Sequence, residues 1–123
     1  MDLNGGPYMT AKDVIDALFQ KYGEDFNWYM LPFTNTTFVD ELKAEIGENH
    51  FLYHQKIYAV AKCESNDEVL YMAEKEDCVE VYYIFHLTYS KKIANGYPKY
   101  KKFTEIFEVK EYMEQCYLED TAT

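Results

Sequence analysis

The stretch that decides the fold is residues 56–89, KIYAVAKCESNDEVLYMAEKEDCVEVYYIFHLTY. Its apolar and polar residues alternate with a period close to two, and it is rich in the β-branched and aromatic residues typical of strands. Two polar segments, Ser65-Asn66-Asp67 and Lys75-Glu76-Asp77, divide it into strands near 56–63, 68–74 and 78–89. Because connections this short join antiparallel neighbours, the stretch predicts a three-stranded meander.

The last of these predicted strands has two unlike faces. One face is apolar or aromatic, with Val79, Val81, Tyr83, Phe85, Leu87 and Tyr89. The other face carries Glu80, Tyr82, Ile84, His86 and Thr88. We expect this second face to be the wetter one, since antiparallel sheets commonly leave one side in solvent.

Helical spacing replaces the period of two on both sides of the meander. The first helix should begin near Thr10, which has capping-box spacing to Asp13, and should end at Gly23. Its predicted buried stripe is Val14, Ile15, Leu18, Phe19 and Tyr22. A second helix is predicted from a cap at Thr37, with Asp40 at the same spacing, to a stop at Gly47. Its narrow stripe is Phe38, Leu42 and Ile46.

A third helix is predicted over about 105–118, and its buried stripe should be Val109, Tyr112, Met113, Cys116 and Tyr117. Residues 26–33 suit either a strand or a packed loop, and a short extended piece is expected around Phe103. The order predicts an α+β domain in which two to three helices pack against a small antiparallel β-meander of three to four strands. We expect a flexible leader over 1–8, one domain over 9–119 and a frayed tail over 120–123.

The charge balance narrows the classes of function. The 123 residues include 22 acidic ones and 12 basic ones, all of them lysine, so the net charge is −10. Arginine, which grips phosphate and carboxylate bidentately, is absent. This balance disfavours binding to nucleic acid or anionic membranes and favours a basic partner. With no signal peptide and no apolar run long enough to span a bilayer, we expect a cytoplasmic protein.

The acidic residues of the meander are candidate partner-binding residues. They fall at its strand ends and turns and are expected to crowd one edge or face: Glu64, Asp67, Glu68, Glu74, Glu76, Asp77 and Glu80. Two interpretations are open: such charges keep a protein soluble, or they form a surface whose repulsion a basic partner relieves. The lysine-rich segment 91–102 is interpreted as a solvated loop or an internal salt partner rather than a nucleic-acid site.

No motif dictates a reaction. His50 and His54 have the i, i+4 spacing of a metal-binding helix but lack the glutamate of a metalloprotease motif, so we expect no metal site and no cofactor. His86 is either a half-buried, hydrogen-bonded residue or part of a ligand pocket with Tyr82 and Thr88. The three cysteines, Cys63, Cys78 and Cys116, are interpreted as buried thiols in a reducing compartment.

The middle of the chain also resembles a known group of proteins. The pattern consists of Ala59-Val60-Ala61-Lys62, an acidic turn, Asp67-Glu68-Val69-Leu70-Tyr71, His86-Leu87-Thr88-Tyr89-Ser90, a loop with Pro98, and Phe103 before a final helix. It resembles small bacterial proteins, some of which look like immunity proteins of polymorphic toxin systems, including contact-dependent inhibition. The resemblance covers about the last two thirds of the domain. It does not identify any binding residue in this sequence.

The resemblance implies a cytoplasmic protein that binds and blocks one cognate toxin. Together with the charge, it predicts a non-enzymatic binding protein for a basic toxin such as a nuclease, to which carboxylates would be offered in place of phosphates. The alternative is a small-molecule binding protein or an enzyme that uses the pocket near Tyr82, His86 and Thr88.

Overall fold

The structure is a computed structural model that describes residues 10–32, 34–74, 80–89 and 98–121. These residues form a five-stranded antiparallel sheet with the strand order β1-β2-β3-β4-β5. The strands are β1 (Trp28–Met30), β2 (Ile57–Cys63), β3 (Glu68–Glu74), β4 (Glu80–His86) and β5 (Tyr100–Phe103). The helices that pack on them are α1 (Ala11–Tyr22), α2 (Thr37–Ile46) and α3 (Ile106–Thr121). The predicted α+β class is therefore confirmed, while the predicted leader over 1–8 lies outside the described residues.

The predicted meander forms the middle of the sheet. β2, β3 and β4 pair in sequence order, and β1 and β5 add one strand at each edge. β1 pairs with β2 through Trp28 and Cys63, which settles the open choice for residues 26–33 in favour of a short strand. β4 ends at His86, earlier than predicted, because the next residues turn toward α2.

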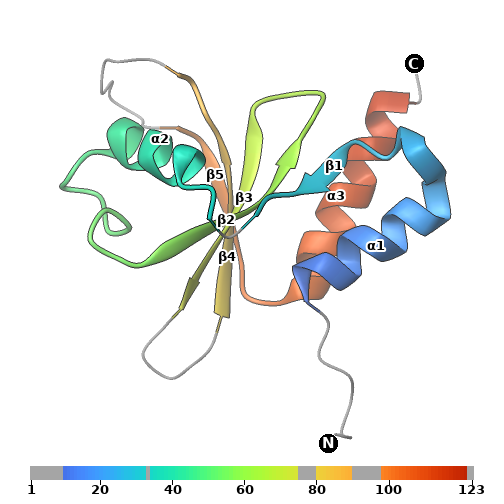
Figure 1. The fold of residues 1–123 in the computed structure, drawn as a ribbon, viewed down its shortest axis with the longest axis horizontal. Coiled ribbons are helices and arrows are strands. Elements are labelled where there is room, and N and C mark those ends of the chain that lie inside the picture. The colour runs from blue at the N-terminus through green and yellow to red at the C-terminus, as the bar shows by residue number, and fades with distance from the viewer. Residues whose placement is uncertain (1–9, 33, 75–79, 90–97, 122–123) are drawn as a thin grey trace, which may run out of the picture.

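Both faces of the sheet are covered by helices (Figure 1). α1 and α3 lie on one side of the sheet and α2 lies on the other. On the second face of β4, Glu80 and His86 stay exposed at the two ends of the strand, so this face is the wetter one, as expected. The middle of the face is nevertheless covered, since Tyr82 and Ile84 are only 5% and 2% exposed beneath α1 and α3.

Local signals set the helix ends. Thr10 and Asp13 form the predicted capping box: the Asp13 N–H donates to Thr10 Oγ1 at 3.2 Å, and the Thr10 N–H donates to Asp13 Oδ2 at 2.9 Å. The predicted cap at Thr37 is wrong, because Thr37 is already helical and the N-cap residue is Thr36, whose side chain makes no capping hydrogen bond. The Thr37 N–H donates instead to Asn35 Oδ1 at 2.9 Å, just before the helix.

Two predictions on the outer helices also need correction. The sequence predicts Phe19 in the buried stripe of α1, but Phe19 is 45% exposed. The set of α1 residues that faces the sheet is narrower than the predicted stripe. The last helix does not fray at residue 120 but continues to Thr121. Asp120 Oδ2 accepts hydrogen bonds from Ser65 Oγ at 2.7 Å and from Asn27 Nδ2 at 3.1 Å, and these bonds hold the final turn against the sheet.

Candidate functional site

The predicted acidic residues lie at two opposite ends of the meander. Glu64 and Asp67 belong to the β2–β3 turn, whereas Glu74 and Glu80 pair with each other at the far end of β3. A seven-residue strand, about 20 Å long, separates the two groups. The expectation that these carboxylates crowd a single edge is therefore wrong. Glu76 and Asp77 lie outside the described residues.

Glu68 is not a surface carboxylate. The Tyr112 hydroxyl on α3 donates to Glu68 Oε2 at 2.6 Å, and Glu68 Oε1 is buried without a hydrogen-bond partner within the part of the chain that the structure describes. Burial and this hydrogen bond raise the pKa of Tyr112. Glu68 thus belongs to the packing between the sheet and α3 rather than to an exposed binding surface.

Packing brings additional carboxylates to the β2–β3 turn. The bond between Asp120 and Ser65 places the C-terminal turn of α3 beside Glu64. On the other side of the turn, the Leu87 N–H donates to the Asp67 carbonyl at 3.0 Å, so the chain after β4 also lies here. We call the exposed or partly exposed acids Glu41, Glu64, Asp67 and Asp120 the carboxylate end.

Two tyrosines stand among these carboxylates. Tyr29 on β1 is 41% exposed and Tyr89 is 48% exposed. Burial raises the pKa of Tyr89, and the negative charges of Asp67, Glu41 and Glu45 raise it further. The carboxylate end therefore combines negative charge with rigid aromatic surface.

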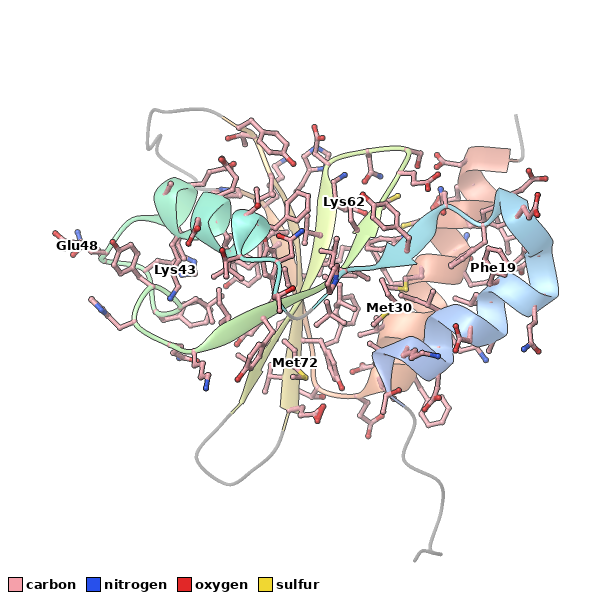
Figure 2. The ribbon with its side chains drawn as sticks, in the orientation of Figure 1. Phe19, Met30, Lys43, Glu48, Lys62 and Met72 are labelled. Atoms are coloured by element: carbon pink, nitrogen blue, oxygen red, sulfur yellow. The ribbon has the colours of Figure 1, made fainter. Side chains whose placement is uncertain are left out.

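Lys62 lies at this same end of the sheet (Figure 2). Its ammonium donates to the carbonyl oxygens of Cys63 and Asn66, both at 2.7 Å. The positive charge is thus directed at the backbone of the β2–β3 turn, where it holds the turn closed.

The most buried charged residue in the described part of the chain is Glu45 on α2, at 4% exposure. Its Oε1 accepts bonds from the Thr88 N–H at 2.8 Å and from the Thr88 hydroxyl at 2.9 Å, while its Oε2 accepts from the Tyr89 N–H at 2.8 Å. Tyr89 has a φ of 55°, a left-handed backbone that a tyrosine rarely adopts. Glu45 therefore holds the chain in an unusual turn as it leaves the sheet.

Sequence reasoning missed Glu45, although a signal was present. The residue is three positions after Leu42 and next to Ile46, so helical spacing puts it on the buried stripe of α2. A carboxylate on such a stripe requires buried donors. Nothing in the sequence pattern shows that Thr88 and Tyr89 supply them.

Glu41 lies one helical turn before Glu45 and shares a proton with it. A hydrogen bond to Glu45, burial and the Glu45 charge raise the pKa of Glu41 to about 7. Burial also works to raise the pKa of Glu45, but the bonds from Glu41, Thr88 and Tyr89 outweigh it and hold the pKa below its ordinary value. The pair consequently carries one negative charge under mildly acidic conditions.

The three residues predicted to form a ligand pocket do not converge. Thr88 is bonded to Glu45 on the α2 side of the sheet, whereas Tyr82 is buried on the other side, where its hydroxyl donates to Glu80 Oε2 at 2.8 Å. His86 does line a hollow of about 640 Å³ between the sheet and α3. The residues around the hollow are Glu68, Ile84, His86, Pro98, Lys99, Tyr100, Lys101 and Tyr112.

Among the remaining histidines and cysteines, His50 and Cys63 have packing roles. His50 Nδ1 accepts the Leu52 N–H at 3.2 Å, burial lowers the His50 pKa, and its ring stacks on Phe51. Cys63 is a buried free thiol and Cys116 is only partly buried, while Cys78 is not among the described residues.

In the described ranges, no three His, Cys, Asp or Glu side chains are grouped so that they could hold a metal ion. No helix formed by the described residues is both long and apolar enough to cross a bilayer.

Comparisons with known proteins add no relative. No protein-family model matches the chain, and no match is found among curated proteins or among solved structures. A function for this chain therefore has to rest on its own residues.

Proposed function

We propose that this is a non-enzymatic binding protein that holds a basic protein partner, in the way that a bacterial immunity protein binds and neutralises its cognate toxin. The observation that supports the proposal is the carboxylate end. There, acids from α2, the β2–β3 turn and α3 lie at the end of the sheet that also carries two half-exposed tyrosines, Tyr29 and Tyr89.

This combination suits a protein interface better than it suits a reaction. Carboxylates gathered at an exposed end of a sheet steer and orient a cationic partner. Tyrosines add large contact area at low cost in side-chain entropy and are enriched at binding hot spots. A basic nuclease surface, which is built to hold phosphates, is the kind of target that such a surface matches.

The test uses the polypeptide encoded beside this gene as the partner. Expressed alone it should arrest growth, and coexpression of the wild-type chain should relieve the arrest. The variant Glu64→Lys with Asp67→Lys should bind that polypeptide at least about tenfold more weakly at low salt, because two attractive contacts become repulsive. The difference should shrink at high salt, since exposed charges are screened.

The matched control is Glu48→Lys with Glu105→Lys, which makes the same change in charge elsewhere. Glu48 lies beyond α2, far from the carboxylate end (Figure 2), and Glu105 precedes α3 at the opposite end of that helix from Asp120. The control should bind and protect like the wild type. Equal weakening of both variants would show a general charge effect and remove the carboxylate end as the binding surface. A neighbouring polypeptide that the wild-type chain does not bind would overturn the immunity function itself.

A further inference from the structure

β5 forms one edge of the sheet, and no other described strand pairs with its outer side. The His86 N–H donates to the Lys99 carbonyl at 2.9 Å. This bond establishes which residues of β5 hydrogen-bond to β4. Since hydrogen-bonded positions alternate in an antiparallel pair, Lys101 and Phe103 also face β4, while Tyr100 and Lys102 direct their N–H and C=O groups outward. The edge therefore offers two donors and two acceptors to an incoming strand.

On the α3 side of this edge lies the hollow described above. Lys99, Lys101 and His86 are exposed around it, and Lys101 Nζ stands 5.0 Å from the centre of the Tyr112 ring. The one carboxylate among the described lining residues is that of Glu68. Its Oε2 accepts the hydrogen bond from the Tyr112 hydroxyl, and its Oε1 is buried. The accessible charge around the hollow is therefore positive, which suits a carboxylate side chain.

On the α2 side of the edge lies a surface of aromatic rings. Tyr100 and Phe51 are 43% and 50% exposed, and their ring centres are 6.2 Å apart. Tyr100 stacks on Phe85 at 4.8 Å, and Phe51 lies 5.9 Å from Tyr83, so the rings are held in place from beneath. Such a surface fits an apolar side chain.

We propose that β5 is a docking edge for an extended, acidic segment of a protein partner. The segment would add a sixth strand, place carboxylate side chains in the hollow, and lay the apolar side chains between them over Tyr100 and Phe51. Side chains of a strand point alternately to its two faces. The acidic side chains of the segment would therefore meet the basic hollow on one side of β5, and its apolar side chains would meet the aromatic rings on the other side. This surface and this partner chemistry are separate from those of the carboxylate end.

A second copy of the chain fits this edge less well. Antiparallel pairing of β5 with its own copy would bring a lysine opposite a lysine, such as Lys101 opposite its own counterpart, and like charges opposite each other destabilise a sheet. Lysines on edge strands discourage self-association for this reason. Opposite an acidic strand, Lys101 instead meets carboxylates and becomes attractive.

The first experiment titrates the acetylated and amidated peptide Glu-Val-Glu-Val-Glu into isotope-labelled protein and follows backbone amide signals by NMR. We expect the Tyr100 and Lys102 amides to shift, and Lys101→Glu to weaken binding at least about tenfold. Lys12→Glu makes the same charge change on α1 and should leave binding unchanged. The peptide Lys-Val-Lys-Val-Lys should shift signals at the carboxylate end instead of at β5.

The second experiment separates strand addition from simple charge attraction. Lys102→Pro removes an outward N–H without removing a bond to β4, and Lys102→Ala removes the same side chain but keeps the N–H. We expect the proline variant to bind at least about tenfold more weakly than the alanine variant. If the proline variant does not fold, the acidic peptide methylated on its valine nitrogens provides the comparison, and it should not bind.

Equal binding by the folded proline and alanine variants, or by the methylated and unmethylated peptides, would overturn strand addition. Peptide-induced shifts that leave Tyr100 and Lys102 unchanged would overturn the site. Shifts at these two amides that depend on protein concentration without any peptide would show that a second copy occupies the edge, which contradicts the proposed occupant.

Discussion

The two faces of the sheet are covered in different ways. Under α1 and α3 the packing is almost wholly apolar, and Leu18 and Met113 have no exposed surface. On the other face α2 packs alone, introduces the buried carboxylate of Glu45, and leaves Phe51 half exposed. The first face is an apolar core closed by two helices, while the second face also fixes the path of the chain after β4 and leaves part of its aromatic surface exposed. Graded substitutions on the two faces test this difference.

The largest loss of stability should come from the face under α1 and α3. Leu18→Ala should lower the free energy of unfolding by about 2 to 5 kcal/mol, because it leaves a cavity in a closed core, and Met113→Ala should act in the same range. Urea denaturation followed by circular dichroism measures it. A midpoint within error of the wild type would mean that this face is not the tight one.

Glu45→Ala should have the next largest effect. It removes the acceptor for two backbone N–H groups and a hydroxyl at a partly buried turn, so we expect a loss of about 1 to 3 kcal/mol. Hydrogen exchange at the Thr88 and Tyr89 amides should speed up more than exchange in β3. The neighbouring exposed change Ala44→Ser is the control. Unchanged protection at Thr88 and Tyr89 would contradict the role given to Glu45.

Glu41 should make the stability of the α2 face depend on pH. Its pKa is raised from 4.5 to about 7 on folding, so the folded chain binds the proton more tightly, and stability falls as pH rises through this window. Glu41→Gln, which keeps a donor toward Glu45 without the second charge, should match the wild type near pH 5. At pH 8 it should be more stable by on the order of 1 kcal/mol, after allowance for solvent screening. Parallel pH profiles of the two proteins would show that the pair shares no proton.

The smallest effect should come from the exposed rings. Phe51→Ala should cost no more than about 1 kcal/mol, since half of the side chain is already in water. Thermal melts beside Leu18→Ala give the comparison. A loss as large as that of Leu18→Ala would mean that both faces are equally closed, and the contrast between them would fail.

The sequence predicted the local parts of this fold well. Alternation located β2, β3 and most of β4, and the Thr10–Asp13 spacing located the start of α1, because these features depend on neighbours along the chain. It did not show that Tyr82 and Ile84 are buried, since that depends on two helices distant in sequence. The predicted last strand also extends too far, to Tyr89. Alternation along the chain does not show that the backbone after His86 leaves the sheet to hydrogen-bond with Glu45.

The candidate surfaces were less predictable than the fold. Acidic composition indicated a basic partner, but the choice of residues needed the register, which places Glu74 and Glu80 at the far end of the sheet. Asp120 was expected in a frayed tail and instead lies against the β2–β3 turn. The extended piece expected around Phe103 is the end of β5, but residues 100–102 fall in the segment interpreted as a loop, because Lys101 and Lys102 are not typical strand residues.

The single tryptophan of the chain, Trp28, makes these differences measurable without any label. It is 2% exposed in β1, on the face that α1 and α3 cover, and its indole N–H has no hydrogen-bond partner within the described ranges. Its fluorescence should therefore be blue-shifted in the native state and should report on that face alone. The near-ultraviolet circular dichroism adds the tyrosines buried under α2, Tyr71 and Tyr83, to the aromatic residues of the first face. Coincident transitions from the two signals would show a single cooperative unit. A loss of circular dichroism that precedes the Trp28 transition would reveal that the α2 side melts first.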